Sequence, residues 1–233
     1  MRPDTLAALR RDLAARRPVV VAKWLATGEE RLLHPFGPSA GGDPVDEKAR
    51  EAARRDRSET VETPAGQVFL LVYNPPPRLV VVGAVHVTQA LVPMARTAGY
   101  DVLVIDPRRS FASADRFQGI PVSTEWPDEA LARMGLDRGC AVVTMTHDPK
   151  IDDPALAAAL RSDAFYVGAL GSRKTQAARR ERLMGMGLSA DDVKRIHGPV
   201  GLPIGAVSPG EIAVSILAEI VASLRMPSEP RAA

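Results

Sequence analysis

Short runs of branched apolar residues recur along the chain from Arg78 onward, and longer amphipathic stretches separate them. Such runs predict buried strands, while the stretches between them have the apolar spacing of helices. This alternation indicates an α/β fold in which a parallel sheet is covered by helices on both faces. We expect strands at 78–84, 101–106, 120–123, 140–146 and 164–170, and helices at 86–98, 127–134, 154–161, 174–186 and 209–224.

The first 77 residues have a different pattern, with shorter strands and two polar helices. Leu6, Leu9 and Leu13 share one face of the first helix, as the helical period requires. Together these segments predict a small α+β domain. We expect a helix from residue 4 or 5, two strands within 18–36 that turn at Gly28, a helix at 46–57 with hardly any apolar face, and a hairpin at 59–74.

Three consecutive prolines at 75–77 separate the two patterns. A proline run is stiff and extended, so it is typical of a spacer between domains. We therefore predict an N-terminal domain over 1–77 and a larger domain over 78–226. The last residues, 227–233, are expected to form a disordered tail. Helix-capping boxes are predicted where Ser189 and Ser208 precede acidic residues by three positions.

The composition of the chain excludes several classes of protein function. The sequence has 30 basic and 28 acidic side chains and a formal net charge of +2, which is too balanced for a nucleic-acid binder. Its single cysteine, Cys140, excludes an internal disulfide and a clustered-thiolate metal site. Cys140 lies in an apolar strand and is expected to be a buried small side chain. No apolar run reaches the roughly 18 residues of a spanning helix, so we expect a cytoplasmic protein without a membrane segment.

The predicted sheet brings three loops to the carboxyl ends of its strands, where such folds bind ligands. The first loop is the opening "GAVHVT" within "LVVVGAVHVTQAL" at 79–91, which resembles a G-x-G-x-x-G fingerprint with Gly83, Val85 and Thr88 at its three positions. Asp106 ends the next strand, the usual place for an acid that binds a ribose hydroxyl. Val85 would occupy the space that a pyrophosphate needs. A plain strand-to-helix turn explains Gly83 about as well as a binding loop does.

The other two loops carry more polar residues. "TMTHDPKIDDP" presents His147 and Asp148, which could be an acid and base, a metal pair, or parts of a turn capped by Asp and Pro. "GALGSRK" places Gly168 and Gly171 before a helix that opens with Ser172, Arg173 and Lys174. Glycines before a basic helix start are typical of an anion nest. A tight turn followed by a solvated basic face is the alternative.

Several of these motifs together resemble one known family. In chain order, the segments "PPPRLVVVGAVHV", "DVLVIDPR", "TMTHDPKIDDPAL", "FYVGALGSRKT" and "PVGLPIGAVSPGEIAVSILAEI" are similar to the XdhC/CoxI family, the maturation factors of molybdenum hydroxylases such as xanthine dehydrogenase. The resemblance covers residues 75–225. It implies a Rossmann-like domain and a chaperone more than a catalyst. Two features depart from the family pattern: Val85 replaces a glycine, and no GGCVE-like segment with a cysteine occurs in 1–77.

The resemblance implies molybdenum cofactor, as the pterin or its dinucleotide form, as bound cargo. Its implied partners are a molybdenum hydroxylase apoenzyme and a cysteine desulfurase, and a homodimer is possible. No catalytic or metal-ligating residue is assigned. Two alternatives stay open: an NAD(P)-dependent oxidoreductase, in which Arg108 or Arg109 binds a 2′-phosphate, and a cofactor-free scaffold between apoenzyme and sulfur donor. The residues expected to hold the cargo are Gly83, His86, Asp106, His147, Gly168, Gly171, Ser172 and Arg173.

Overall fold

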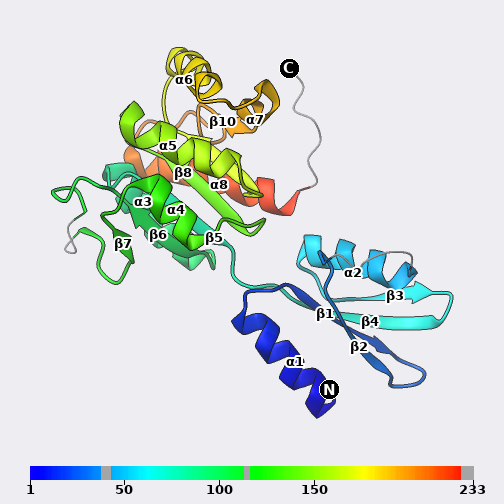
Figure 1. The fold of residues 1–233 in the computed structure, drawn as a ribbon. Helices are drawn as coiled ribbons and strands as arrows, with labels where there is room; N and C mark the ends of the chain where they lie inside the picture. Colours follow the sequence, from blue (N-terminus) through cyan, green and yellow to red (C-terminus); the bar gives the residue numbers. More distant parts are fainter. Residues whose placement is uncertain (38–42, 113–115, 227–233) are drawn as a thin grey trace. The chain divides into compact units, whose positions relative to one another are not determined.

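The computed structural model describes residues 1–37, 43–112 and 116–226 and divides into two compact units (Figure 1). The first unit comprises Met1–Pro75, and the second begins at Pro76, within the proline run. The tail predicted to be disordered, 227–233, lies outside the described residues. Each unit has its own hydrophobic core, so each is described by itself.

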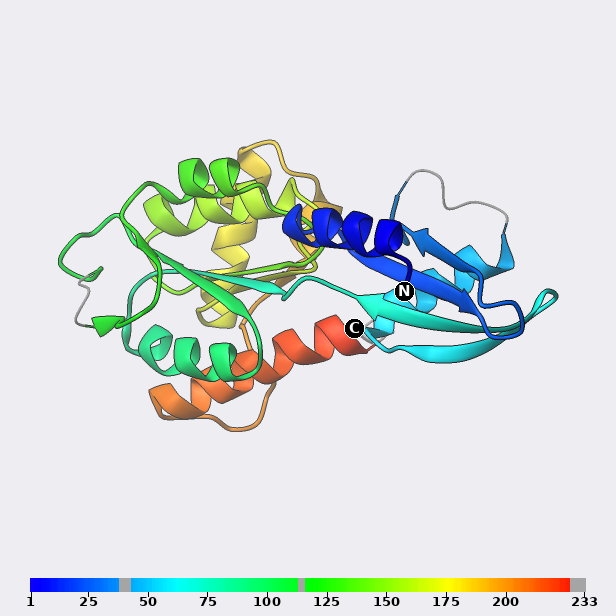
Figure 2. The same cartoon turned by 90° about the horizontal axis from the view of Figure 1, so that it is seen from below.

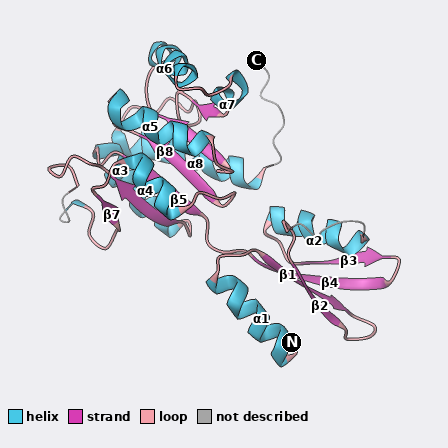
Figure 3. Ribbon diagram, in the orientation of Figure 1, coloured by secondary structure: helices cyan, strands magenta, loops and turns pink. Residues whose placement is uncertain are grey.

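The first unit is built on a four-stranded antiparallel sheet with the order β2-β1-β4-β3 (Figure 3). Val20, Ala22, Val68 and Leu70 form the core on one face of this sheet. They come from the two central strands, because alternate residues of a strand point to the same face. The strands are β1 (Val19–Trp24), β2 (Glu30–Leu33), β3 (Glu59–Thr63) and β4 (Gly66–Tyr73).

Two helices complete the first unit, α1 (Pro3–Ala14) and α2 (Pro44–Arg55). The expectation that the second helix has hardly any apolar face is wrong. Four of its residues are buried against the sheet: Val45, Ala49, Ala52 and Ala53. Small alanines let the helix lie close to the strands, and a face made of alanines is inconspicuous among the surrounding charges. α1 instead packs through Leu9 against the other face.

The second unit is the α/β domain expected from the sequence. Its six-stranded sheet has the order β10-β9-β8-β5-β6-β7, and every strand pair is parallel. The last strand was not predicted, because it consists of only two residues and has no pattern of its own. The strands are β5 (Arg78–Val82), β6 (Asp101–Ile105), β7 (Val122–Ser123), β8 (Cys140–Thr144), β9 (Tyr166–Ala169) and β10 (Ile196–His197).

Helices cover both faces of this sheet (Figure 2). On one side α3 (His86–Thr97) and α8 (Pro209–Arg225) pack on the odd-numbered residues of β5, Leu79 and Val81. On the other side α4 (Pro127–Met134) and α5 (Pro149–Leu160) pack on Val80 and Val82. The helices α6 (Arg173–Gly185) and α7 (Ala190–Lys194) contribute to the same second core. No helix among the described residues is long and apolar enough to cross a membrane.

Capping chemistry sets where these helices begin. The capping boxes predicted at Ser189 and Ser208 are both confirmed. The helix expected from residue 154 begins earlier, at Pro149, because the side chain of Asp148 accepts a hydrogen bond from the Lys150 N–H. Pro154 therefore lies inside the helix, where it leaves one backbone carbonyl without its helical donor.

Candidate functional site

The four central strands β9, β8, β5 and β6 end at the same edge of the parallel sheet. The loops that follow them are the ones singled out in the sequence. Such an edge collects helix N-termini and unpaired backbone N–H groups, which favour anions.

The turn after β5 is held by its neighbours on both sides. The Gly83 N–H donates to the carbonyl of Ile105 at 2.8 Å. Gly83 has a φ of +114°, and a Cβ at this position would lie 2.7 Å from Cγ2 of Thr146, in the loop after β8. Gly83 is therefore required by the close approach of this loop as well as by its backbone conformation.

The next two residues lead into α3. Val85 has an extended backbone and is half-buried against the core shared by α3 and α8. His86 is the first helical residue and is exposed. Within the described chain no side chain caps this helix start, and its first turn contains no acidic residue.

Asp106 directly follows β6 and is shielded from solvent. Its side chain is fully buried, and Oδ2 accepts a hydrogen bond from the Ala84 N–H at 2.8 Å. Both carboxylate oxygens also accept from the Arg108 guanidinium, Oδ1 from Nε at 2.9 Å and Oδ2 from Nη2 at 2.8 Å. Burial alone would raise the pKa of Asp106, but the hydrogen bonds from Arg108 and Ala84 outweigh it, so the pKa lies below its ordinary value. In this arrangement the carboxylate orients Arg108 and presents no free oxygen at the surface.

Arg108 itself is the more accessible member of this pair. Its side chain is 32% exposed, and its guanidinium lies over the ring of Phe111 at 4.3 Å from the centroid. Hydrogen bonding to Asp106 raises the pKa of Arg108. The sequence suggested Arg108 only for a 2′-phosphate, although an arginine two residues after a strand-terminal acid can form this bidentate pair in a single turn.

The loop after β8 is a tight turn around a buried carboxylate. His147 is exposed and has a φ of +63°, and its N–H donates to Oδ2 of Asp152 at 3.1 Å. Thr146 Oγ1 donates to the other oxygen, Oδ1, at 2.7 Å. Asp148 caps α5, as the turn interpretation expected. Across residues 1–37, 43–112 and 116–226, no group of three His, Cys, Asp or Glu side chains could hold a metal ion.

The Asp152 carboxylate also connects the loop after β8 to the loop after β9. Asp152 pairs with Arg179 of α6, with Oδ2 and Nη2 3.2 Å apart and side chains only 1% and 2% exposed. Arg179 also donates to the carbonyl of Leu170 at 3.2 Å and to Oε1 of Gln176 at 2.8 Å. Burial raises the pKa of Asp152 and lowers that of Arg179. The sequence did not indicate this pair, because its members are 27 residues apart and each lies inside a helix.

The two glycines of the "GALGSRK" segment have different roles. Gly168 lies inside β9, where a Cβ would be 2.7 Å from Cγ2 of Val200 and 2.8 Å from the Tyr166 ring. Its surroundings are therefore packed protein. Gly171 follows the strand with a φ of +137°, a conformation that favours glycine.

The helix start after Gly171 remains open to solvent. Ser172 caps α6 by accepting from the Thr175 N–H at 3.2 Å. Arg173 is exposed, and the first turn contains no acidic residue. The loops after β5, β6, β8 and β9 thus form one continuous chain of contacts that ends at this basic helix start.

Known proteins resemble this chain over much of its length. Residues 79–220, more than half of the chain, match the XdhC Rossmann domain. The molybdenum cofactor insertion chaperone PaoD of Escherichia coli is 32% identical over 161 residues, which are 69% of this chain and 44% of PaoD. A probable xanthine dehydrogenase subunit of Bacillus subtilis is 31% identical over 155 residues, which are 66% of this chain and 45% of that protein. The chain therefore spans less than half the length of these curated relatives.

A solved structure is similar over nearly the whole chain. The crystal structure of a xanthine dehydrogenase from Bacillus halodurans has a TM-score of 0.71 and 28% sequence identity. The match covers 95% of this chain and 67% of that one.

Proposed function

Because this chain belongs to the XdhC family, we propose that it binds molybdenum cofactor at the carboxyl edge of its parallel sheet and delivers it to a molybdenum hydroxylase. The name of its relative PaoD, a molybdenum cofactor insertion chaperone, supports a maturation role of this general kind. The cofactor is cargo in this proposal, and the partners are the apoenzyme and a sulfur donor such as a cysteine desulfurase.

The observation that carries the proposal is the distribution of charge at the helix starts. Both α3 and α6 begin at this edge without an acidic residue in the first turn, whereas every other described helix has at least one there. Free N–H groups and the helix dipole favour an anion at such a terminus. Arg108 and Arg173 add two guanidinium groups to the same edge.

A phosphate-bearing pterin fits these donors. Guanidinium groups bind phosphate oxygens through charge-assisted hydrogen bonds, which are stronger than neutral ones. The two hydrogen bonds that Arg108 donates to Asp106 hold its guanidinium in place before a ligand arrives, so less side-chain entropy is lost on binding. We assign the cargo contacts to His86, Arg108, His147, Ser172 and Arg173, with Asp106 as the residue that positions Arg108.

The chain's own thiol is unsuited to carrying sulfur. Cys140 is fully buried at the first position of β8, at the opposite end of the strand from the candidate site. Burial raises the pKa of the Cys140 thiol to about 11, and the thiolate is the reactive form. We therefore propose that any sulfur transferred to the cargo passes directly from a partner protein.

The test is anaerobic purification from a host that makes molybdenum cofactor, followed by mass spectrometry of the small molecule released. We expect a pterin derivative with the wild-type chain. Arg108→Gln and Arg173→Gln should each lower the retained pterin by about tenfold, the equivalent of one charge-assisted hydrogen bond. Arg133→Gln, which changes an exposed arginine in the last turn of α4 that is not assigned to the cargo contacts, is the matched control.

Two results would contradict this placement: a wild-type chain that releases no pterin, or arginine variants that retain as much as the control. Nicotinamide dinucleotide in place of a pterin would favour the oxidoreductase alternative, in which Arg108 contacts a 2′-phosphate. Co-purification of an apoenzyme without any small molecule would favour a scaffold that holds no cofactor.

A further inference from the structure

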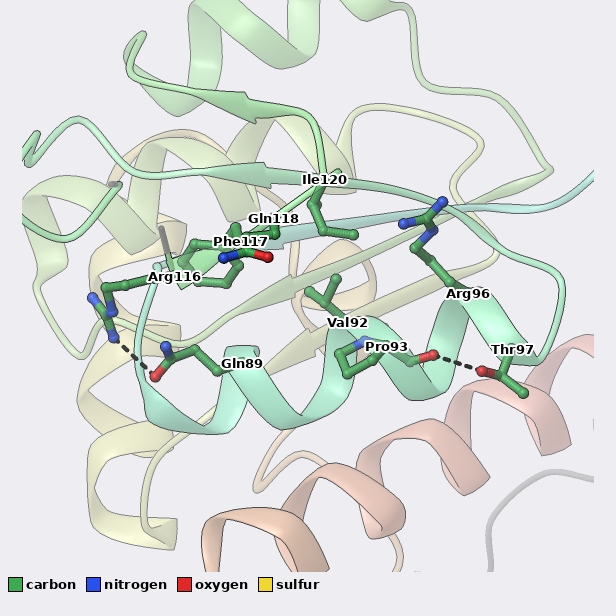
Figure 4. Close-up of a pocket in the computed structure, with 9 residues that line it drawn as sticks. All are labelled: Gln89, Val92, Pro93, Arg96, Thr97, Arg116, Phe117, Gln118 and Ile120. Atoms are coloured by element: carbon green, nitrogen blue, oxygen red, sulfur yellow. Dashed lines mark hydrogen bonds between the residues drawn. The ribbon is translucent and has the colours of Figure 1, made fainter. Parts of the chain in front are cut away.

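A groove of about 520 Å³ lies beside α3, between this helix and the later part of the loop after β6. One wall is the outer side of α3, and the other is the segment 116–120 that leads into β7 (Figure 4). Its volume is within the range of small-molecule sites in proteins, about 300–1,000 Å³. Nothing in the proposed delivery of cofactor uses this groove.

The middle of the groove is apolar. Val92 and Phe117 are almost fully buried, at 1% and 4% exposure, and form its floor. Pro93 and Ile120 line it from the two walls (Figure 4). A ligand lying here would cover the apolar surface that Pro93 and Ile120 still expose to water, which is favourable.

An arginine closes each end of the groove. Arg96 of α3 donates from Nη1 to the carbonyl of Gly119 on the opposite wall at 3.2 Å. Arg116 donates from Nη2 in the reverse direction, to Oε1 of Gln89 on α3, at 3.2 Å. Both bonds bridge the two walls, so both guanidinium groups are fixed in position. Gln89 and Arg96 are seven residues apart on the helix, which places the two ends about 10 Å apart.

Both arginines keep donors for a ligand. A guanidinium has five N–H donors. Arg96 uses one of them for Gly119, and Arg116 uses two, for Gln89 and for the carbonyl of Phe111 at 3.0 Å. Among the described residues no carboxylate forms an ion pair with either arginine. The groove therefore combines an apolar floor with two fixed cations that no described carboxylate neutralises.

We propose that this groove binds a small anion with a flat, apolar body, such as an aromatic carboxylate, sulfonate or phosphate. The apolar body lies on Val92, Phe117 and Ile120, and the anionic group accepts hydrogen bonds from the arginines. A cation would be repelled by both ends. A neutral molecule of the same shape would gain the apolar contacts but not the charge-assisted bonds.

The test uses 8-anilinonaphthalene-1-sulfonate as probe and the uncharged N-phenyl-1-naphthylamine as its counterpart. Fluorescence and calorimetric titration of the full chain should give saturable binding of one sulfonate per chain. The uncharged compound should bind at least about tenfold more weakly, because it lacks a charge-assisted bond. Arg96→Gln and Arg116→Gln should weaken sulfonate binding by a similar factor.

Because the arginines bridge the walls, a second variant separates binding from folding. Gln118→Trp fills the groove from an exposed position and should abolish binding without removing a bridge. Arg173→Gln, at the carboxyl edge, should leave binding unchanged, so that this result is independent of the proposed cofactor site. The proposal is overturned by absence of saturable binding, by equal affinity for the uncharged compound, or by full affinity in the Gln118→Trp variant.

Discussion

Arg179 and Asp152 form an ion pair that is almost completely shielded from water, with Nη2 and Oδ2 3.2 Å apart and side chains 2% and 1% exposed. The pair joins α6 to the first turn of α5, where Asp152 accepts hydrogen bonds from the loop after β8, and Arg179 also holds the carbonyl of Leu170. The Nε of Arg179 is buried and has no hydrogen-bond partner among the described residues. One buried contact thus positions both polar loops of the candidate site.

Replacing Arg179 with Met should lower the free energy of unfolding by about 3–5 kcal/mol, because it leaves the Asp152 charge buried and unpaired. Urea unfolding would measure the loss. Arg182→Met is the matched control, since Arg182 pairs with Asp153 but is 39% exposed; we expect a loss of about 1 kcal/mol or less there. Similar losses in the two variants would show that burial of the pair is unimportant.

Gly83→Ala should destabilise the chain by about 3 kcal/mol, from backbone strain and from the contact with Thr146. Gly99→Ala separates these causes, because Gly99 also has a positive φ, +88°, but a Cβ there would have no atom within 4 Å; strain alone predicts about 1 kcal/mol. Adding Thr146→Ser to Gly83→Ala removes Cγ2 and keeps the hydroxyl that bonds Asp152. Thermal unfolding of the three variants should place the double variant between the single ones. A double variant no more stable than Gly83→Ala would exclude the contact as a cause.

Glu219 of α8 should make stability depend on pH in the acid range. Burial alone would raise its pKa, but hydrogen bonds from His197, Tyr166 and the Gly201 N–H lower it from 4.5 to about 2. Because the folded-state pKa is the lower one, this stabilisation is complete above about pH 5 and is lost as the pH falls toward 2. It corresponds to about 3 kcal/mol at neutral pH.

The measurement is urea unfolding of the wild type and of Glu219→Gln at pH 7 and pH 3. The wild type should be the more stable at pH 7, and the difference should shrink at pH 3. Glu125→Gln, at an exposed carboxylate, should show no such convergence. A difference that is the same at both pH values would refute the role of ionised Glu219.

Val85→Gly restores the glycine of the fingerprint, yet we do not expect it to increase retained cofactor. Val85 is already half-buried against the core between α3 and α8, so part of its side chain is used in packing. The variant should instead lose about 1 kcal/mol of stability, through lost packing and greater freedom of the unfolded chain. Mass spectrometry of bound pterin and thermal unfolding check both parts. A clear gain of cofactor would mean that Val85 limits binding.

The local pattern of the sequence was sufficient for most strands and helices of the second unit and for the capping boxes at Ser189 and Ser208. It was insufficient where an element is too short or its apolar face too small, as in β10 and in α2, with its buried alanines. The predicted start of α5 at Pro154 is wrong, because the cap at Asp148 determines where this helix begins.

Local sequence was enough to establish that a parallel sheet forms and that its polar loops gather at the carboxyl edge, because apolar periodicity and turn residues are local properties. Which side chains pair across that edge follows from the tertiary structure alone. At that edge Asp106 pairs with Arg108 and Asp152 with Arg179, and elsewhere in the second unit Glu219 accepts hydrogen bonds from three separate segments. These contacts depend on strand order and on how the helices pack, and most of them join residues that no short sequence window contains.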